Sequence, residues 1–478
     1  MREELVRELA GIVGAEHVLT GPAELVAYSY DGTFQQAVPD VVVSPSTTEE
    51  VAAVVRAAAG AGLPVITRGA GTSLAGGTIP VGGGLVLNLA RMNRILEIDR
   101  ENSVAAVQAG VVTADLQRAV EAEGLFYPPD PASLQQSTIG GNVACNAGGP
   151  RCLKYGVTRD YVLGLTVVLA DGRVLRLGGK VLKSATGYPL TQLFVGSEGT
   201  LGVVTEAVLR LRPLPRARST AAAYFAEIDQ ASRAVTAVFA AGVLPAALEL
   251  LDRTAMRVVE EHLGLGLPPE AEAMLVLEQD GHDEAAVRAE AAAMAEACRA
   301  AGAFQVRTAA TPAERDELWR ARRAVSGALG RAAPNKLGED VVVPRGRIPE
   351  MVRAVREIER ESGLAIAVFG HAGDGNLHPN ILFDLRREGE LARVERAAAA
   401  IFEAALSLGG TLSGEHGIGT LKREFLETAL GPEVVAVMRA LKAVLDPQGL
   451  LNPHKVFPEA DRSAFLRSLP TLEGRTPG

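Results

Sequence analysis

The chain has 478 residues, which predicts two or three domains at roughly 100–200 residues per domain. Its 48 Lys and Arg against 57 Asp and Glu give a net charge of −9, which argues against a nucleic-acid binder, and a hydrophobic fraction of 47% excludes a disordered chain. Two counts are unusual, 51 glycines and 7 histidines. The glycine excess predicts many places where backbone turns sharply or approaches a ligand, and scarce histidine makes any local cluster informative.

The three cysteines, Cys145, Cys152 and Cys298, are too few for a disulfide framework or a four-thiolate iron–sulfur cluster, which favours a reducing compartment. The N-terminus lacks the basic-then-apolar order of a signal peptide. No apolar run reaches the ~18–20 residues that span a bilayer. We therefore expect a soluble, cytoplasmic protein, with peripheral membrane association left open.

Residues 1–35 are expected to form a short helical lead-in, after which strands and helices alternate. Thr47 and Glu50 form a capping-box pattern, in which the Thr47 hydroxyl meets a backbone N–H and Glu50 reaches back, and this predicts a helix over 51–61. The other elements predicted here are strands at 40–43, 64–67, 85–89, 95–99, 104–108, 162–169, 174–177 and 202–211 and a helix at 113–122 started by Thr113. Residues 127–149, rich in Gly, Pro, Ser and Asn, are predicted as a long functional loop.

The second half of the chain, from a boundary near Arg216, is poorer in glycine and richer in Ala, Glu and Arg. Strands are predicted at 247–251, 273–277 and 340–343. Long amphipathic helices are predicted between them, for example at 283–301 and 314–330, because apolar residues recur at helical spacing.

A glycine-rich run, Arg68-Gly69-Ala70-Gly71-Thr72-Ser73-Leu74-Ala75-Gly76-Gly77, directly follows the predicted strand 64–67. Successive backbone N–H groups in such a loop can converge on a phosphate. The run is not the Rossmann fingerprint, because Leu74 occupies the third glycine position, and it has no Walker GK[ST]. A phosphate site and a set of tight turns both remain open from this run alone.

Two further motifs follow it, Ser137-Thr138-Ile139-Gly140-Gly141-Asn142 with Asn146-Ala147-Gly148-Gly149, and Gly196-Ser197-Glu198-Gly199-Thr200 running on to Glu206. From about residue 36 to 215 the three ordered motifs resemble the FAD-binding domain of the family named for p-cresol methylhydroxylase and vanillyl-alcohol oxidase. The branch is that of the glycolate oxidase flavoprotein subunit and D-lactate dehydrogenases. The resemblance implies an α+β protein with a two-subdomain FAD-binding domain of the p-cresol methylhydroxylase type. An α+β substrate domain with a central antiparallel sheet and a C-terminal helical return would follow.

The resemblance also implies domain limits. Residues 1–35 would be the lead-in, 36–215 the FAD-binding domain and 216–440 the substrate domain with a metal site. Residues 441–478 would return to the FAD-binding domain.

For the cofactor, the resemblance implies that the loop Arg68–Gly77 holds the FAD pyrophosphate and that the later motifs contact the flavin, phosphates, adenine and ribose. Relatives that attach the flavin covalently do so through a His in the first loop. Here that stretch reads Gly71-Thr72-Ser73, so non-covalent FAD is expected. The expected cofactor-binding residues are Arg68, Gly69, Ala70, Gly71, Thr72, Ser73, Gly76, Gly77, Pro129, Ser137, Thr138, Gly140, Gly141, Asn142, Ala147, Gly148, Glu198, Gly199 and Val204. Pro189 departs from the branch, which commonly has an acidic residue there.

Three of the seven histidines lie in two glycine-rich stretches, Gly370–Asn380 and Ser413–Gly419. Two imidazoles and a carboxylate form a usual ligand set for Zn²⁺ or a similar divalent ion, with structural turns as the alternative. The same family branch carries this pair of motifs in its substrate domain. It implies His371, His378 and Glu415 as metal ligands, with Zn²⁺ favoured over Mn or Fe, and His416 as the general base.

The resemblance further implies that Asn380 contacts substrate and that Arg322, Ser326 and Lys336 hold the substrate carboxylate. For Arg322 the alternative is a solvated helix face, and His454 is expected to be structural.

The implied activity is FAD-dependent oxidation of a small 2-hydroxy acid of the D-lactate or glycolate type to the 2-oxo acid. His416 would remove the hydroxyl proton with metal assistance, and the hydride would pass to flavin N5. Two alternatives stand beside it, D-2-hydroxyglutarate oxidation and a non-catalytic flavin-binding subunit of a glycolate oxidase complex. The latter should lack the histidine motifs. An electron-acceptor subunit and a homodimer are open partners.

Overall fold

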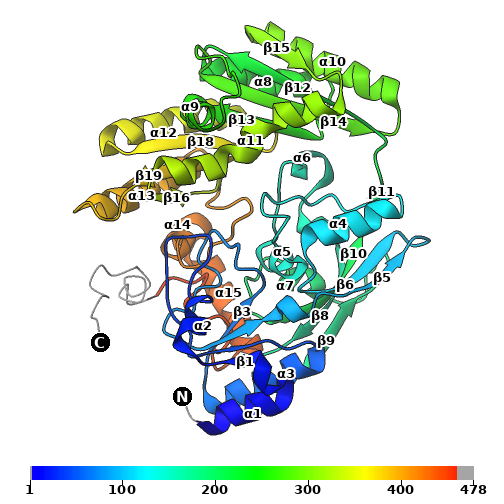
Figure 1. The fold of residues 1–478 in the computed structure, drawn as a ribbon, viewed down its shortest axis with the longest axis vertical. Coiled ribbons are helices and arrows are strands. Elements are labelled where there is room, and N and C mark those ends of the chain that lie inside the picture. Colours follow the sequence, from blue (N-terminus) through cyan, green and yellow to red (C-terminus); the bar gives the residue numbers. More distant parts are fainter. Residues whose placement is uncertain (1–2, 460–478) are drawn as a thin grey trace. The chain divides into compact units, whose positions relative to one another are not determined.

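The computed structural model describes residues 3–459, and every element and contact below belongs to them. Within them the chain divides into two compact units, and Figure 1 labels many of their elements. Unit 1 comprises residues up to 148, then 157–214, and then the chain from 415 onward. Unit 2 comprises 149–156 and 215–414. No helix in residues 3–459 is long and apolar enough to cross a membrane.

Unit 1 contains two main sheets. The first has the strand order β1-β2-β4-β3, in which β2, β4 and β3 run parallel and β1 is antiparallel to β2. The second has the order β5-β6-β10-β8-β9 and is antiparallel throughout. Their strands are β1 (Val18–Leu19), β2 (Val41–Val43), β3 (Val65–Arg68), β4 (Leu85–Asn88), β5 (Ile95–Asp99), β6 (Val104–Gln108), β8 (Val162–Val168), β9 (Val174–Gly178) and β10 (Val203–Arg210). A short pair joins β7 (Leu125–Phe126) to β11 (Arg212–Pro213).

Unit 1 also contains helices before, between and after its strands. They are α1 (Glu3–Val13), α2 (Pro22–Val26), α3 (Thr48–Ala61), α4 (Thr113–Ala122), α5 (Ile139–Cys145), α7 (Leu190–Phe194), α14 (Leu426–Leu430) and α15 (Pro432–Leu445). The predicted lead-in is therefore helical in α1 and α2, with β1 between them.

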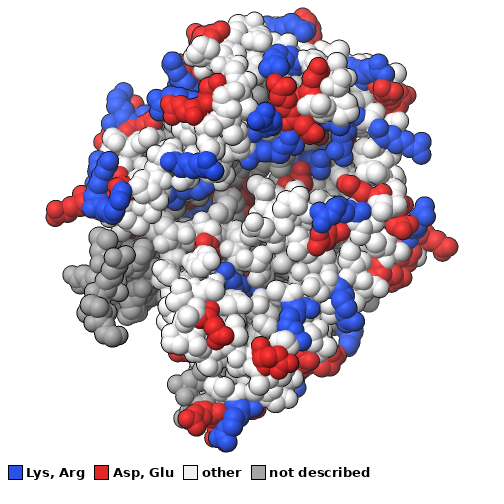
Figure 2. Space-filling view, in the orientation of Figure 1, with Lys and Arg blue, Asp and Glu red and all other residues white. Residues whose placement is uncertain are grey.

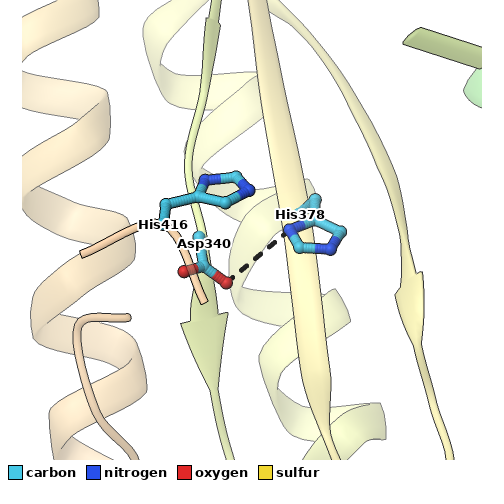
Figure 3. A group of neighbouring side chains, drawn as sticks. All are labelled: Asp340, His378 and His416. Carbon is cyan, nitrogen blue, oxygen red and sulfur yellow. Dashed lines mark ion pairs between the residues drawn. The ribbon is translucent and has the colours of Figure 1, made fainter. Parts of the chain in front are cut away.

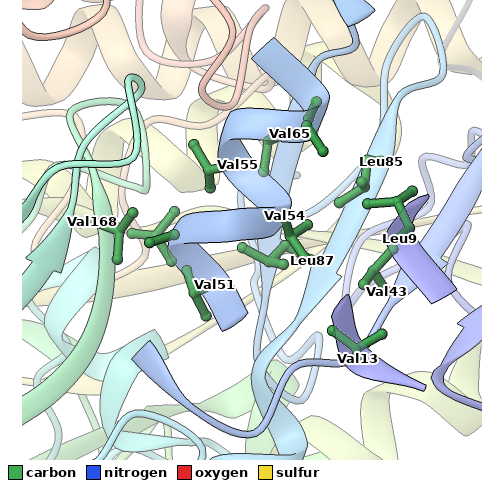
Figure 4. Packing of buried hydrophobic residues seen from close by; sticks show 14 of the residues in the cluster. Leu9, Val13, Val43, Val51, Val54, Val55, Val65, Leu85, Leu87 and Val168 are labelled. Atoms are coloured by element: carbon green, nitrogen blue, oxygen red, sulfur yellow. The ribbon is translucent and has the colours of Figure 1, made fainter. Parts of the chain in front are cut away.

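Helix α3 shows how sequence pattern and core packing agree. Val51, Val54 and Val55 are buried at helical spacing and pack against Leu85 and Leu87 of β4 (Figure 4). The Thr47 hydroxyl accepts a hydrogen bond from the Glu50 backbone N–H at 3.1 Å, as predicted. In a capping box the Glu50 carboxylate would accept from the Thr47 backbone N–H. Here it accepts from the Ser46 backbone N–H, one residue earlier, at 2.7 Å.

The long loop predicted at 127–149 is partly wrong, because it contains helix α5. Thr138 caps the helix by accepting from the Gly141 N–H at 3.3 Å. Ile139, Asn142 and Val143 are its buried residues, at spacings of three and four. The small residues that suggested a loop allow close packing instead, since a Cβ on Gly140 would lie 2.7 Å from the Ala109 Cβ.

Helix α4 has the predicted bounds, and Thr113 is its first residue as predicted. The Thr113 hydroxyl donates to the Ser137 backbone oxygen at 3.0 Å and accepts from the Asn142 amide at 2.8 Å. Position 113 therefore ties α4 to the segment leading into α5.

The C-terminal helical return is confirmed within unit 1. After α15 the chain passes beside β3, where the Val65 N–H donates to the Leu450 oxygen at 2.8 Å and the Asn452 N–H donates to the Val65 oxygen at 2.8 Å. Asp446 fixes this turn by accepting from the backbone N–H groups of Leu450 and Leu451. The last described segment thus extends the sheet that carries the glycine-rich loop.

Unit 2 is built on one large antiparallel sheet, which confirms the predicted class of the second domain. Its strand order is β15-β12-β14-β13-β18-β19-β16, and β17 pairs with β19. The strands are β12 (Ala217–Phe225), β13 (Ala247–Asp252), β14 (Ala273–Gly281), β15 (Gln305–Thr308), β16 (Asn335–Gly338), β17 (Val341–Val342), β18 (Ala365–His371) and β19 (Asn376–Phe383). The helices are α6 (Cys152–Tyr155), α8 (Ile228–Ala240), α9 (Arg253–Leu263), α10 (Glu284–Ala300), α11 (Pro312–Ala332), α12 (Ile348–Ser362) and α13 (Glu390–Ser407).

The two faces of the unit 2 sheet have different partners. Helices α9 and α11 pack on the face that carries Leu251, Met274 and Phe369. Successive side chains of a strand point to opposite faces, so the alternate residues meet α8, α10 and α12, which also contact these strands. The strand predicted at 340–343 is shorter than expected, because only Val341 and Val342 pair with β19.

Charge on the molecule is mixed in sign. Lys and Arg are interspersed with Asp and Glu over the face drawn in Figure 2.

Candidate active site

Unit 1 holds a cavity of about 690 Å³ at the carboxyl end of β3. Five of the residues expected to bind FAD line it, namely Arg68, Gly69, Ala70, Gly71 and Thr72. Tyr28, Asp31, Asn88 and Gln136 are among the remaining lining residues. The other residues expected to bind the cofactor also belong to unit 1.

The glycines of this loop are required by the space around them. A Cβ on Gly69 would lie 2.3 Å from the Thr138 hydroxyl oxygen. Gly71 has φ +72°, and a Cβ there would lie 2.1 Å from an Arg68 guanidinium nitrogen. Backbone in this loop therefore packs directly against neighbouring polar groups, which glycine permits because it has no Cβ.

A group of buried ionisable side chains, Asp31, Glu198 and Lys455, also belongs to unit 1. Burial raises the pKa of the Asp31 carboxyl, although Thr33 donates to it from both N–H and hydroxyl. Burial also lowers the pKa of Lys455 to about 7, and its ammonium donates to the Ile79 backbone oxygen at 2.7 Å. Opposite charges in this group offset part of the desolvation cost of each.

The lowered pKa of the buried Lys455 predicts that the stability of the protein depends on pH. Between about pH 7 and about pH 10 the unfolded chain holds this proton and the folded protein does not, so the free energy of unfolding rises with pH. Each pH unit in that window contributes up to about 1.4 kcal/mol. The measured quantity is the melting temperature of the wild-type protein minus that of Lys455→Met. We expect this difference to increase by roughly 2 °C or more from pH 7 to pH 9. A difference that stays constant over this range contradicts the assignment.

Glu198, one of the residues expected to bind the cofactor, is hydrogen-bonded to neighbouring backbone within unit 1. Its carboxylate accepts from the Ile418 N–H at 2.8 Å and from the Gly419 N–H at 2.7 Å. Its backbone oxygen accepts from the Asn452 amide at 2.7 Å. Within unit 1 this side chain therefore anchors the loop after His416, and contact with adenine or ribose stays a prediction.

Removing the Glu198 carboxylate should be costly. We expect Glu198→Ala to lower the free energy of unfolding of unit 1 by about 3 kcal/mol, because two backbone donors lose a charged acceptor. Glu198→Gln keeps one acceptor oxygen and should lose about half as much. Urea unfolding followed by fluorescence measures both, and equal stability of all three proteins would overturn the anchoring role.

In unit 2 the register of the strands gathers the predicted site residues on the face covered by α11. Residue pairs Glu249–His371 and Phe369–His378 lie opposite each other on adjacent strands. His371 and His378 are consequently diagonal neighbours, with ring centroids 5.2 Å apart and ligand nitrogens within 4.8 Å of each other. Both are buried.

A glutamate that the sequence argument missed lies beside them. The Glu249 carboxylate is fully buried, and its oxygens lie 2.7 and 2.9 Å from His371 Nδ1. Arg322 of α11 donates from Nε to Glu249 at 2.6 Å, with its guanidinium 4.9 Å from the Phe369 ring centroid. These partners hold the pKa of Glu249 below its usual range against the effect of burial. The alternative of a solvated helix face for Arg322 is wrong, because the side chain is buried.

Asp340 organises the chain that leads to the second histidine motif. Its carboxylate accepts from the Ser413 hydroxyl at 2.6 Å, from the Gly414 N–H at 2.9 Å and from the Asn376 amide at 2.6 Å. It also forms an ion pair at 3.7 Å with His378 Nδ1 (Figure 3). Gly414 is needed here, since a Cβ would lie 2.7 Å from the Asn376 amide nitrogen.

The other residues expected to hold substrate are in the same unit. Lys336 of β16 donates to the Ser326 hydroxyl at 2.6 Å, and burial lowers the pKa of its ammonium. Ser326 lies one turn after Arg322 on α11. Asn380 is buried and donates to the His378 backbone oxygen at 2.9 Å.

Glu415 and His416 are the first residues of the last segment of unit 1 and follow Gly414 directly in the chain. His416 Nε2 lies 4.0 Å from the Glu415 carboxylate. The predicted structural residue His454 pairs with Glu459 through its Nδ1.

Family models match both halves of this chain. A model described as FAD binding domain covers residues 39–178, and one described as FAD linked oxidases, C-terminal domain, covers 214–456. The chain belongs to the FAD-linked oxidase family. As a member it is an FAD-dependent oxidoreductase.

Similar proteins cover nearly the whole FAD-linked oxidase chain. The glycolate oxidase subunit GlcD of Bacillus subtilis is 47% identical, over 97% of this chain and 99% of that protein. A D-lactate dehydrogenase of Archaeoglobus fulgidus is 40% identical, over 90% and 95%. The structure of p-cresol methylhydroxylase with substrate bound has a TM-score of 0.78 at 17% identity, over 95% and 96%, so the predicted fold is confirmed.

The residues of the FAD-linked oxidase fit the implied groups. For FAD, the unit 1 cavity has the volume of a ligand pocket and is lined by the glycine-rich loop, where a Cβ on Gly69 or Gly71 would collide with neighbouring polar groups. For a divalent metal, two buried imidazoles with ligand nitrogens within 4.8 Å are the donor type that Zn²⁺ and similar ions prefer.

Proposed function

We propose that this FAD-linked oxidase oxidises a small 2-hydroxy acid of the glycolate or D-lactate type to the corresponding 2-oxo acid. The observation that carries the proposal is the placement of His371, His378 and Arg322 on one face of the unit 2 sheet. Imidazoles suited to a metal beside a buried cation match a substrate that has a hydroxyl next to a carboxylate. The names of the relatives, glycolate oxidase subunit and D-lactate dehydrogenase, support the same substrate class.

In this proposal Arg322 and Lys336 bind the substrate carboxylate. Arg322 uses Nε for Glu249, so its terminal nitrogens are the donors that would reach the substrate. Lys336 and Ser326 already hydrogen-bond each other and would form one polar wall. Asn380 would add a further contact from β19.

Glu415 would complete the metal ligands with His371 and His378, and His416 would take the hydroxyl proton. Chain connectivity supports the role of Glu415. The Gly414 N–H donates a hydrogen bond to Asp340, and the Glu415 Cα is only ~3.8 Å from the Gly414 Cα. A divalent ion, Zn²⁺ or alternatively Mn or Fe, would lower the pKa of the substrate hydroxyl when bound. A neutral imidazole with a pKa near ~6.5 is suited to accept that proton.

FAD would supply the two-electron oxidation at C2 of the substrate, and His416 would take the hydroxyl proton of the acid. We propose that the glycine-rich loops of unit 1 hold the FAD without a covalent bond. A separate subunit would accept the electrons and reoxidise the flavin. The name of the Bacillus subtilis relative, glycolate oxidase subunit GlcD, supports this inference.

Steady-state turnover tests the proposal. The purified FAD-loaded protein is assayed with an artificial dye acceptor against glycolate, D-lactate, L-lactate and D-2-hydroxyglutarate, with the 2-oxo acid product identified. We expect glycolate or D-lactate to give the highest kcat/KM. Preference for D-2-hydroxyglutarate would transfer the proposal to a longer substrate, and turnover of none of the four would overturn it.

A further inference from the structure

Glu249 lies between a residue assigned to the metal and a residue assigned to the substrate. It faces His371 through both carboxylate oxygens and receives the Nε–H of Arg322. We propose that Glu249 is a positioning residue that fixes His371 for metal binding and Arg322 for the substrate carboxylate. This inference rests on the proposed function and adds to it a residue that touches neither substrate nor metal.

The hydrogen bond to His371 determines which ring nitrogen can bind a metal. A carboxylate accepts hydrogen bonds, so Nδ1 of His371 must carry the proton at 2.7 Å from Glu249. The lone pair is then on Nε2, and that nitrogen becomes the metal ligand. A carboxylate behind the imidazole also increases the basicity of the ligand and prevents the ring from turning.

The same carboxylate sets the plane of Arg322. Its Nε donates to Glu249 at 2.6 Å, and the Phe369 ring supports the guanidinium from a centroid distance of 4.9 Å. Glu249 and Arg322 are both buried and form an ion pair, so each charge has a partner of opposite sign. Loss of Glu249 would therefore loosen two site residues at once.

The sheet places Glu249 there by register. It lies inside the apolar strand β13, between the buried residues Leu248 and Leu250, and pairs with His371 on β18. Alternation turns Glu249 toward α11 and its neighbours toward the opposite face. A lone carboxylate in such a strand is expensive to bury without partners, which indicates a specific role.

The test measures metal affinity rather than activity. The FAD-loaded protein is stripped with a chelator, and its dissociation constant for Zn²⁺ is measured by competition with a chromogenic chelator. We expect Glu249→Gln to weaken Zn²⁺ binding about 10- to 100-fold, with FAD content and circular dichroism unchanged. The amide keeps one acceptor oxygen and the volume of the side chain, so this variant should fold.

Glu278→Gln is the matched control. Glu278 is another buried glutamate of the same sheet, on β14, and its carboxylate accepts from Trp319 Nε1 at 2.8 Å and from the Thr220 hydroxyl at 2.9 Å. Its replacement should leave the Zn²⁺ affinity unchanged.

The outcomes separate the two claims. If Glu249→Gln binds Zn²⁺ as tightly as the wild type, the positioning role is overturned while the proposed function stands. If Glu278→Gln shows the same loss, the effect is general to buried carboxylates and the positioning role is again overturned. If the stripped wild-type protein binds no Zn²⁺, Mn²⁺ or Fe²⁺, the metal site of the proposed function fails and this inference fails with it.

Discussion

Replacing His416 by Asn is expected to leave FAD bound and to slow flavin reduction by glycolate or D-lactate about 10²- to 10⁴-fold. The reason is that an amide matches the imidazole in size but cannot accept a proton near neutral pH, and a positioned base contributes a factor of this order. Rapid mixing of the oxidised variant with substrate under anaerobic conditions measures the rate from the loss of flavin absorbance.

His454→Asn is the matched control for that experiment. His454 belongs to the same last segment of the chain, and its contact is the ion pair with Glu459. We expect its flavin to be reduced at close to the wild-type rate. Wild-type reduction in His416→Asn would remove His416 from the role of base.

Loss of a histidine proposed to bind the metal is expected to be equally severe. His378→Ala should lower bound metal well below one ion per chain and reduce turnover about 10³-fold, since Lewis-acid assistance supplies several kcal/mol and 1.36 kcal/mol corresponds to a factor of ten. Metal content by mass spectrometry and dye-linked turnover are measured on the same sample.

His282→Ala controls for the loss of any histidine in unit 2, because His282 is exposed. It should keep full metal content and activity. A chelator-treated wild-type protein should lose its activity and regain it with added metal. Unchanged turnover in a fully demetallated protein would exclude His371, His378 and Glu415 from the reaction.

Local pattern was enough to predict much of the fold. Strands 95–99 and 104–108 have the predicted bounds. The cap at Thr47 is predicted from the residue types at four adjacent positions. Helix α5 was missed because its glycines suggested a loop, although Thr138 and the buried positions 139, 142 and 143 formed a helical pattern.

The partners of the site side chains could not be predicted in the same way. Glu249 and His371 are 122 residues apart, and Asp340 and Gly414 are 74 apart, so only the register of the sheet and the course of the loop bring them together. The signal available for Glu249 was a single carboxylate in the apolar strand 247–251. For Glu198 the cofactor contact implied by the family motif stays a prediction, and the hydrogen bonds from the backbone at 418 and 419 to its carboxylate span more than 200 residues of sequence, beyond the reach of local pattern.

We propose that this chain itself transfers electrons from a 2-hydroxy acid to its FAD. The most direct test is anaerobic titration of the purified FAD-loaded protein with glycolate, D-lactate and L-lactate, without any dye or partner. We predict that glycolate or D-lactate bleaches the flavin completely, with one 2-oxo acid formed per flavin reduced. A flavin that stays oxidised with all three acids, yet is reduced by dithionite, would contradict the account.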